Sequence, residues 1–335
     1  MRAIISGVGH FAPDRKLTNA DLERMVDTND EWITTRTGIK ERRILDPKAG
    51  TSEMAVPAAR MALDRAGVSP SDLDLIIIAT VTPDRPVPSM AAYVQDALGA
   101  NRCWGFDING GCAGFLCALT TGAQFIEAGR HRHVLVVGAD KMSAITDYQD
   151  RNTCVLFGDA AGAVVLSPAD SDDAGITDFE LHVDGTGAPY LYIAAGGAIE
   201  PASHETVEAR RHYVYQDGRV VFKHAVNAMA EVSARLLARN GVDPAALKLL
   251  IPHQANYRII DAVARKLNLR PDQVMVNIQR YGNTTAATIP MAMSEAYQAG
   301  RLSPGDPVVV SAFGAGFTWG AVLLTWQMAQ PAPED

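Results

Sequence analysis

An internal repeat at an offset of 174 residues constrains this fold more than any other feature of the sequence. The segment AGVSPSDLDLIII (66–78) recurs as NGVDPAALKLLIP (240–252). The same offset carries the apolar run HVLVVGA (133–139) onto PVVVSAF (307–313). Chance similarity among segments rich in Ala, Val and Gly is the alternative, but we favour two homologous copies.

Two copies suit a pseudo-symmetric pair rather than a solenoid, which needs at least three repeats. We therefore predict two halves, at 1–172 and 173–335, joined near 167–176 by the turn-rich segment SPADSDDAG. Continuously apolar runs such as LDLIIIATV (73–81) are typical of strands buried on both faces. Alanine-rich stretches such as 113–129 predict helices between the strands, and this alternation favours an α/β fold with parallel pairing.

Composition narrows the class of protein. Hydrophobic residues make up 47% of the 335 residues, which excludes intrinsic disorder, and the net charge of −8 argues against nucleic-acid binding. No apolar run reaches the roughly 18 residues of a membrane span, and the N-terminus lacks the long apolar region of a signal peptide. We therefore expect a cytoplasmic protein with no membrane partner. None of the four cysteines forms a CxxC pair, so we expect no metal site.

Cys112 is a candidate nucleophile. It follows Gly110-Gly111 in FDINGGCAGF and precedes a predicted helix. A helix start presents the side chain, and the helix dipole favours the thiolate. The alternative is a buried cysteine behind a simple glycine turn.

His253 and Asn283 are candidate polar partners of Cys112. His253 directly follows a predicted buried strand in LLIPHQANYR, and functional sites of α/β sheets gather at the carboxyl ends of strands. Asn283 follows a glycine turn in RYGNTTAATIP, and it lies 17 residues before Gly300, as Cys112 lies 17 before Gly129. Pseudo-symmetry would therefore bring these two helix starts together. The alternatives are a structural histidine and an ordinary asparagine N-cap.

Two further segments draw attention. Glycine-rich FGAGFTWG (313–320) follows a predicted strand and could point backbone N–H groups at an oxyanion, although a tight turn is the alternative. Residues 195–213 lack periodicity, so we predict a long loop of the kind that often forms a lid or binding element.

Together these pieces resemble β-ketoacyl-acyl-carrier-protein synthase III, a family of condensing enzymes with the thiolase fold. That fold consists of two pseudo-symmetric α/β halves whose mixed central sheets pack in layers with helices. The segments that carry the resemblance span nearly the whole chain: EWITTRTGIKERR (31–43), FDINGGCAGF (106–115), VLFGDAAGAVVL (155–166), PHQANYRII (252–260), GNTTAATIP (282–290) and FGAGFTWGAVLL (313–324).

The resemblance implies a Cys112–His253–Asn283 triad. Cys112 would take the acyl group of an acyl-CoA, and His253 and Asn283 would stabilise the enolate formed when a malonyl thioester loses CO₂. The backbone N–H groups of Cys112 and Ala315 would form the oxyanion hole. The reaction would be the condensation of an acyl-CoA with malonyl-acyl-carrier protein that starts type II fatty acid synthesis. No resident cofactor is implied, since the CoA thioester is a substrate.

The resemblance also implies residues that contact the substrates. Trp32 and Arg151 match a pair that clamps adenine, Arg36 matches a phosphate contact, and Asn256 matches a pantetheine contact. A basic face should receive the acidic carrier protein. Its candidate residues are Lys223, Arg258, Arg265 and Lys266, of which the last three lie at i, i+7 and i+8 of one predicted helix.

Val87 bears on the choice of substrate. The family resemblance implies a homodimer in which the segment around residue 87 reaches into the partner's acyl pocket. A bulky aromatic often occupies this position, whereas this chain has valine. We therefore expect starters longer or more branched than acetyl to be accepted. The 195–213 loop is also longer than in compact members, and its role is open.

Other functions fit these residues less well. A biosynthetic thiolase would need a second cysteine in the FGAGF loop, and a papain-like hydrolase would need a CGSC-type segment; both are absent. A non-catalytic acyl-CoA-binding protein is disfavoured because all three triad residues are present. A starter-unit condensing enzyme or acyltransferase of secondary metabolism remains an open alternative.

Overall fold

The computed structural model describes residues 2–169, 171 and 174–331. The predicted boundary between the halves at 172/173 lies outside the described residues. The first sheet consists of β1 (Ala3–Phe11), β4 (Leu75–Ala79), β5 (Trp104–Ile108), β6 (Val134–Lys141) and β7 (Asp159–Pro168). Its order is β1-β7-β6-β4-β5. β4 is parallel to β5 and β6, whereas β7 is antiparallel to β6 and β1, so the sheet is mixed.

The second sheet repeats this arrangement. It consists of β8 (Gly175–Val183), β11 (Leu249–Pro252), β12 (Pro307–Gly314) and β13 (Thr318–Thr325), in the order β11-β12-β13-β8. The 174-residue offset carries Leu75 of β4 onto Leu249 of β11. Each of the four strands of the second sheet matches a strand of the first sheet in its neighbours and direction, and among the described residues β5 of the first sheet has no counterpart there. The predicted pair of pseudo-symmetric α/β halves is confirmed.

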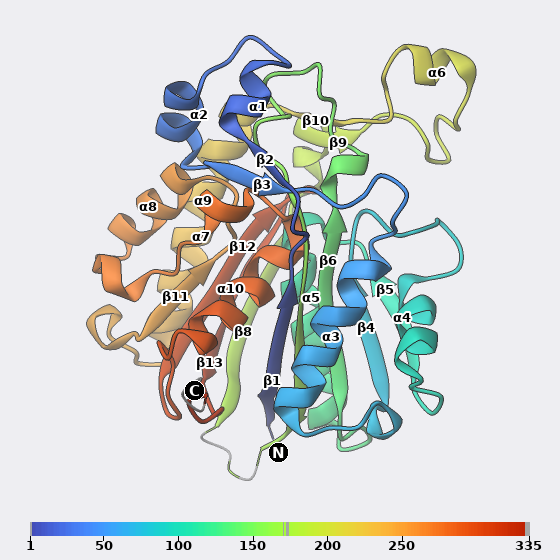
Figure 1. Ribbon diagram of the computed structural model, residues 1–335. Coiled ribbons are helices and arrows are strands. Elements are labelled where there is room, and N and C mark those ends of the chain that lie inside the picture. The colour runs from blue at the N-terminus through green and yellow to red at the C-terminus, as the bar shows by residue number, and fades with distance from the viewer. Residues whose placement is uncertain (1, 170, 172–173, 332–335) are drawn as a thin grey trace.

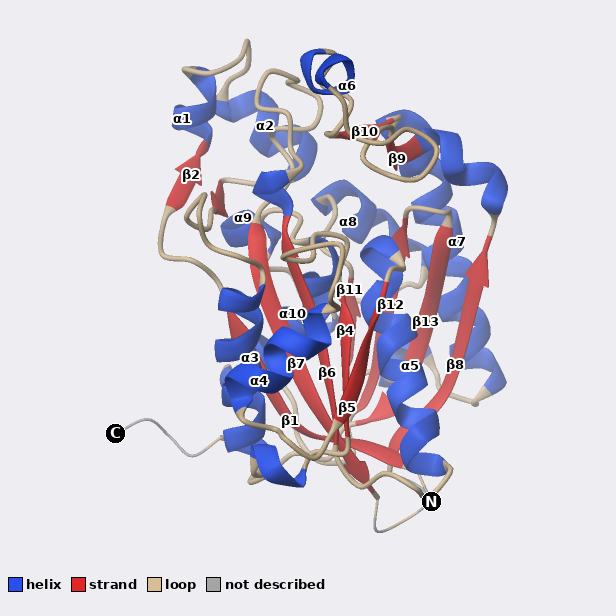
Figure 2. Cartoon of the chain, turned by 90° about the vertical axis from the view of Figure 1, so that its right-hand side faces the viewer, coloured by secondary structure: helices blue, strands red, loops and turns tan. Residues whose placement is uncertain are grey.

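Helices cover both sheets and fill the space between them (Figures 1 and 2). α3 (Ser52–Ala66) and α4 (Met90–Leu98) share one apolar core with the first sheet. α7 (Gly218–Arg239) and α8 (Tyr257–Lys266) share another with the second sheet. The central core joins both sheets through α5 (Gly114–Glu127) and α10 (Thr288–Gln298). Within the described part of the chain, no helix combines the length and the apolar character that crossing a membrane requires.

Two glycines in the strands of the first sheet set how closely α10 and the turn before it approach that sheet. A Cβ atom at Gly138 of β6 would lie 2.2 Å from the carbonyl oxygen of Ala286. A Cβ atom at Gly162 of β7 would lie 2.5 Å from the backbone nitrogen of Met291. The chain leading into α10 therefore rests directly on the backbone of the sheet. This contact fixes the depth of the turn that contains Asn283.

Smaller elements gather at one end of the two sheets, opposite the start of β1 and the end of β13 (Figure 1). They are β2 (Lys16–Thr18), α1 (Asn19–Glu23), α2 (Asp30–Thr37), β3 (Glu41–Arg43), β9 (Leu191–Ile193), α6 (His204–Glu208), β10 (Val214–Gln216) and α9 (Ile278–Tyr281). β2 pairs antiparallel with β3, and β9 with β10.

The sequence predicts a long loop at 195–213, and the structure adds one short helix to it. This segment joins β9 to β10 and contains α6, which Figure 1 shows projecting from the body. Ser203 starts the helix, because its side chain accepts a hydrogen bond from Thr206 N while the Thr206 hydroxyl accepts one from Ser203 N. A five-residue helix is too short to show a periodic pattern in the sequence.

Candidate active site

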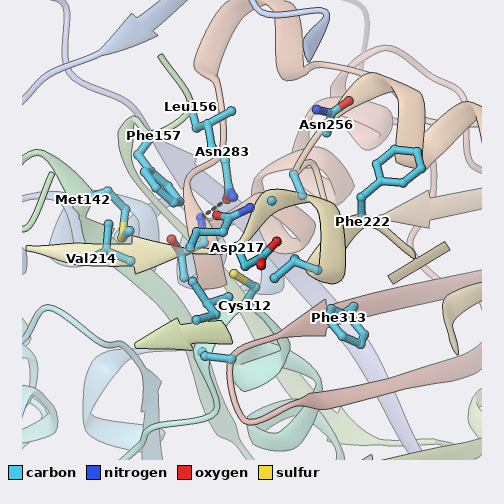
Figure 3. A pocket seen from close by; sticks show the side chains of 18 of the residues that line it. Cys112, Met142, Leu156, Phe157, Val214, Asp217, Phe222, Asn256, Asn283 and Phe313 are labelled. Carbon is cyan, nitrogen blue, oxygen red and sulfur yellow. Dashed lines mark hydrogen bonds between the residues drawn. The ribbon is translucent and has the colours of Figure 1, made fainter. Parts of the chain in front are cut away.

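One cavity of about 970 Å³ is lined by all three candidate catalytic residues, Cys112, His253 and Asn283. Cys112 comes from the segment after β5, His253 directly follows β11, and Asn283 lies between α9 and the 3₁₀ turn Thr285–Ala287. The cavity therefore lies at the carboxyl ends of strands from both sheets, where the sequence places it. In Figure 3, Cys112 and Asn283 line the same space, with Met142 and Phe157 on one side.

Cys112 lies in the 3₁₀ turn Gly111–Ala113, immediately before α5. Gly111 adopts φ +54°, and a Cβ atom there would lie 3.0 Å from Ala315 N. A Cβ atom at Gly314 would lie 2.6 Å from Cys112 N. Glycine at these two positions thus lets the backbone segments of Cys112 and Ala315 approach each other, and both residues line the cavity.

The expected preference of Cys112 for the thiolate is wrong. Burial raises the pKa of the Cys112 thiol to about 12, and the negative charge of Asp140 contributes in the same direction. At neutral pH the Cys112 side chain is therefore a thiol. The sequence shows the helix start, but it does not show how closely protein surrounds the sulfur.

His253 is buried beside Thr288. Its Nδ1 lies 2.7 Å from Thr288 Oγ1, and its backbone nitrogen donates to Ser311 O at 2.8 Å. Its Nε2 is buried and makes no hydrogen bond with the described residues. Burial lowers the pKa of the ring to about 3, so His253 is neutral at physiological pH. One ring nitrogen is thus anchored, and the other is left for a ligand.

The side chain of Asn283 is held by its own turn. Its Oδ1 accepts a hydrogen bond from Thr285 N at 2.9 Å, so its Nδ2 group is left as the donor. The backbone of Asn283 is bonded on both sides, through Leu156 O at 2.9 Å and Gly158 N at 3.0 Å. Asn283, from the second half, is therefore fixed to a segment of the first half.

A buried arginine supports that segment. Arg42 is fully buried and donates from Nε (3.1 Å) and from Nη2 to Val155 O, one residue before Leu156. Its Nη1 donates to Asn19 Oδ1 at 2.5 Å, and Asn19 Nδ2 donates to Asp30 of α2 at 2.7 Å. Among the described residues no carboxylate forms an ion pair with Arg42. The sequence segment KERR gives no sign of this role.

A buried aspartate supports the cavity from another side. Asp140 accepts hydrogen bonds from Val81 N at 2.8 Å through Oδ1 and from Ala286 N at 3.1 Å through Oδ2. It therefore joins the segment after β4 to the turn that follows Asn283. Burial raises the pKa of Asp140 to about 6. A carboxylate directly after the apolar run HVLVVGA was the available sequence signal, and sequence analysis missed it.

The candidate CoA-binding residues lie together near the mouth of the cavity. Trp32, Arg36 and Asn256 line it, and the guanidinium carbons of Arg36 and Arg151 lie 5.0 Å and 4.8 Å from the centre of the Trp32 ring. Asn256 also caps α8, since its Oδ1 accepts from Arg258 N at 2.9 Å. Arg151 lies beside the cavity and does not line it.

The candidate docking residues are exposed on two helices that pack together. Lys223 lies on α7, and Arg258, Arg265 and Lys266 lie on α8. Arg265 pairs with Asp261 at 2.6 Å, and Lys266 bonds Asn227 Oδ1 at 2.9 Å. Arg219, on the first turn of α7, also lines the cavity and is exposed, but sequence analysis did not single it out.

Val87 does not line the cavity of its own chain. It lies between β4 and α4, and 79% of its surface is exposed. The predicted role of Val87 as a gate therefore requires a second copy of the chain and stays a prediction.

Comparisons with known proteins agree with this architecture. Residues 106–185 match the family model for 3-oxoacyl-[acyl-carrier-protein] synthase III, and residues 237–326 match the model for its C-terminal part. The chain is 50% identical over 329 residues to the β-ketoacyl-[acyl-carrier-protein] synthase III of Chlorobium phaeovibrioides, covering 98% of this chain and 100% of that protein. It is 52% identical over 327 residues to the synthase III of Solibacter usitatus, with coverage of 97% and 99%.

Solved structures give the same result. The 3-oxoacyl-[acyl-carrier-protein] synthase III of Aquifex aeolicus superposes with a TM-score of 0.89 at 46% identity, covering 97% of this chain and 100% of that one. The priming β-ketosynthase of the R1128 polyketide pathway superposes with a TM-score of 0.91 at 34% identity, with coverage of 98% and 97%.

The neutral state of His253 gives a testable pH dependence of stability. Below pH 6.5 the unfolded chain protonates this histidine, whereas the folded chain does not until about pH 3. Folding should therefore lose about 1 kcal/mol through His253 between pH 6 and pH 5. Urea unfolding at both pH values should show wild type losing about that much more stability than His253→Gln. Equal losses in the two proteins would contradict a buried, neutral His253.

Proposed function

This chain belongs to the β-ketoacyl-[acyl-carrier-protein] synthase III family, and we propose that Cys112, His253 and Asn283 divide its reaction into two steps. The chain is an acyltransferase that condenses an acyl-CoA starter with malonyl-acyl-carrier protein, and it thereby initiates fatty acid synthesis. The observation that carries the assignment of residues is the meeting of all three at one cavity, where His253 Nε2 lacks a protein partner.

In the first step, Cys112 receives the acyl group. Its sulfur attacks the thioester carbonyl, the bond from carbonyl carbon to CoA sulfur breaks, and the thiol proton of Cys112 leaves with CoA as its thiol. The N–H groups of Cys112 and Ala315 stabilise the tetrahedral oxyanion. Because the resting nucleophile is a thiol, the attack depends on this stabilisation rather than on a preformed thiolate.

In the second step, the malonyl thioester loses CO₂ and the enolate attacks. Breaking the bond to the carboxylate moves an electron pair toward the thioester oxygen, where Asn283 Nδ2 and His253 Nε2 donate hydrogen bonds. The enolate carbon then bonds the acyl carbon, and the Cys112 sulfur leaves and takes up a proton from solvent. The product is a β-ketoacyl-acyl-carrier protein.

The role of His253 requires a proton on Nε2. A neutral ring has that proton when Nδ1 accepts a hydrogen bond. The Thr288 hydroxyl can donate its single proton either to Nδ1 at 2.7 Å or to Thr285 O at 3.0 Å. The first arrangement leaves Nε2 as a donor, so Thr288 sets the tautomer that the second step uses.

We assign the mouth of the cavity to CoA. Trp32 and Arg151 would clamp the adenine between a π-face and a planar guanidinium, Arg36 would contact phosphate, and Asn256 would contact pantetheine. Arg151 now lies over the Trp32 ring, and its ion pair with the exposed Asp27 is long, at 3.5 Å. Arg151 can therefore move aside for the adenine at little cost. On this account CoA is a substrate, and the reaction needs no resident cofactor.

The sheet edge supports a homodimer. β5 is the last strand of the first sheet, and Trp104 at its start is 50% exposed. An unpaired edge with an exposed aromatic residue favours pairing with a second chain about a two-fold axis. Val87 belongs to the loop after the neighbouring β4 and would reach the partner's acyl pocket. We place this homodimer in the cytoplasm.

A priming role in secondary metabolism is the second candidate. Its support is the superposition on the priming ketosynthase of a polyketide pathway. That protein is 34% identical to this chain, whereas several fatty-acid-type synthases III reach about 50%. The higher identity favours fatty acid synthesis.

The half-reactions separate the three residues. Cys112→Ala should form no acyl adduct with acyl-CoA, because the covalent bond forms at that sulfur. Asn283→Ala and His253→Ala should keep the adduct but lose malonyl decarboxylation by about 10²–10³-fold, the usual effect of one oxyanion donor. Intact-mass spectrometry and CO₂ release measure the two steps. An adduct on Cys112→Ala, or wild-type decarboxylation by Asn283→Ala, would contradict the assignment.

Charge reversal tests the docking face. Lys223→Glu or Arg265→Glu should raise the KM for malonyl-acyl-carrier protein without changing acylation by acyl-CoA, and the effect should shrink as salt rises. Lys248→Glu is a matched control, because this exposed lysine precedes β11, at the end opposite His253. An equal effect of the control, or loss of both steps in the helix variants, would refute docking here.

Chain length tests Val87. Val87→Phe should lower activity with a C6 or C8 acyl-CoA far more than with acetyl-CoA, because each CH₂ that loses its place forfeits about 0.8 kcal/mol of burial. Steady-state rates with the two starters measure the ratio. Equal losses would show that Val87 does not gate the pocket, and a monomer in analytical ultracentrifugation would remove the basis for the prediction.

A further inference from the structure

Thr285 has an unusual backbone at the centre of the site. Its φ is +52°, in the left-handed region, where a β-branched residue is rare and costs about 1–3 kcal/mol. This conformation directs its N–H to Asn283 Oδ1 at 2.9 Å, and its carbonyl oxygen lies 3.0 Å from Thr288 Oγ1. The backbone of Thr285 therefore orients Asn283 and lies against the threonine that anchors His253.

The side chain of Thr285 is not explained by these backbone contacts. Glycine would supply the same N–H and carbonyl groups with less strain. Thr285 is 3% exposed and lines the cavity, and its hydroxyl makes no hydrogen bond within the described part of the chain. A buried hydroxyl without a partner is itself destabilising. Thr285, on the wall of the cavity, therefore combines a strained backbone with a buried hydroxyl that has no partner among the described residues.

The neighbouring threonine makes the comparison sharper. Thr284 also has a buried hydroxyl without a partner among the described residues, but it does not line the cavity and its φ is −99°. A missing partner alone therefore does not indicate a ligand. Thr285 differs from Thr284 in its contact with the cavity and in its left-handed backbone.

The charges around the cavity suggest which ligand atom Thr285 meets. The charged side chains that line it, Arg36, Asp217, Arg219 and Arg258, are exposed or half-buried, whereas the buried polar side chains that line it, such as His253, Asn283 and Thr285, carry no charge. Among the lining residues, a malonyl carboxylate placed beside Asn283 would thus find uncharged donors only. A hydroxyl can hold such a carboxylate and still release it, because CO₂ is a much weaker acceptor than a carboxylate.

We propose that the Thr285 hydroxyl donates a hydrogen bond to the malonyl carboxylate and holds it in place for decarboxylation. The proposal rests on the proposed function, in which Asn283 and His253 bind the thioester oxygen of the same malonyl group. The hydroxyl keeps its proton throughout: the bond between the malonyl α-carbon and its carboxylate breaks, the electron pair passes to the enolate, and CO₂ leaves Thr285. Thr285 thereby contributes to the second step alone.

Three variants test the proposal. Thr285→Val preserves shape and branching but removes the hydroxyl, Thr285→Ser keeps the hydroxyl, and Thr284→Val removes a buried hydroxyl away from the cavity. Thr285→Val should lose about 10- to 100-fold in kcat/KM for malonyl decarboxylation, the effect of one hydrogen bond to a charged group. Its acylation by acetyl-CoA should stay within twofold of wild type. Its melting temperature should not fall, because the hydroxyl has no protein partner to lose. Thr285→Ser should restore most of the rate, and Thr284→Val should match wild type.

The outcomes separate this proposal from the one on which it rests. If Asn283→Ala loses decarboxylation while Thr285→Val retains the wild-type rate, the Thr285 assignment alone is wrong. If both steps fall equally in Thr285→Val, or its melting temperature drops, the residue is structural and the proposal is overturned. If Asn283→Ala decarboxylates at the wild-type rate, the proposed division of the reaction fails, and the Thr285 assignment fails with it.

Discussion

The arrangement of the site depends on a buried guanidinium that has no carboxylate partner among the described residues. Arg42 donates to Val155 O, and the adjoining segment bonds the backbone of Asn283 on both sides. Asn283 lines the same cavity as Cys112 of the other half. Burial lowers the pKa of Arg42 to about 10, which still leaves it charged at neutral pH. Its Nη1 group reaches α2 through Asn19, so Arg42 helps to hold both the turn that contains Asn283 and the helix that contains Trp32.

Cys112 and His253 are both uncharged in the resting protein. The pKa of the Cys112 thiol is raised and that of the His253 ring is lowered, both mainly by burial. A thiolate–imidazolium pair is therefore disfavoured in the resting protein. In the proposed reaction, charge develops on the oxyanion of the first step and on the enolate of the second, and preorganised N–H donors are most effective where charge develops. The burial that keeps Cys112 a thiol also strengthens these hydrogen bonds.

The sequence predicts the strands and the turns that carry the site better than the buried residues that hold those turns in place. The repeat that relates Leu75 to Leu249 identifies equivalent strands, and the strand exits identify Cys112 and His253, because both signals are local. Arg42 and Asp140 could not be assigned, since each bonds a backbone group of the site region that lies more than 50 residues away along the chain. The left-handed backbone of Thr285 also depends on tertiary contacts, and nothing in NTTAAT marks it.

The two strand glycines divide the molecule into regions of different evolutionary freedom. At Gly138 and Gly162 the sheet touches the chain around α10 with no side-chain layer between them, so no larger residue can be absorbed there by a change of rotamer. Substitutions that change which acyl starters are accepted would have to avoid this seam, the contact of Gly138 and Gly162 with the chain around α10. They can act instead on residues of the cavity rim outside the two sheets, such as Leu191 of β9 and Val214 of β10. Descendants of this chain should diversify at the rim while the seam stays unchanged.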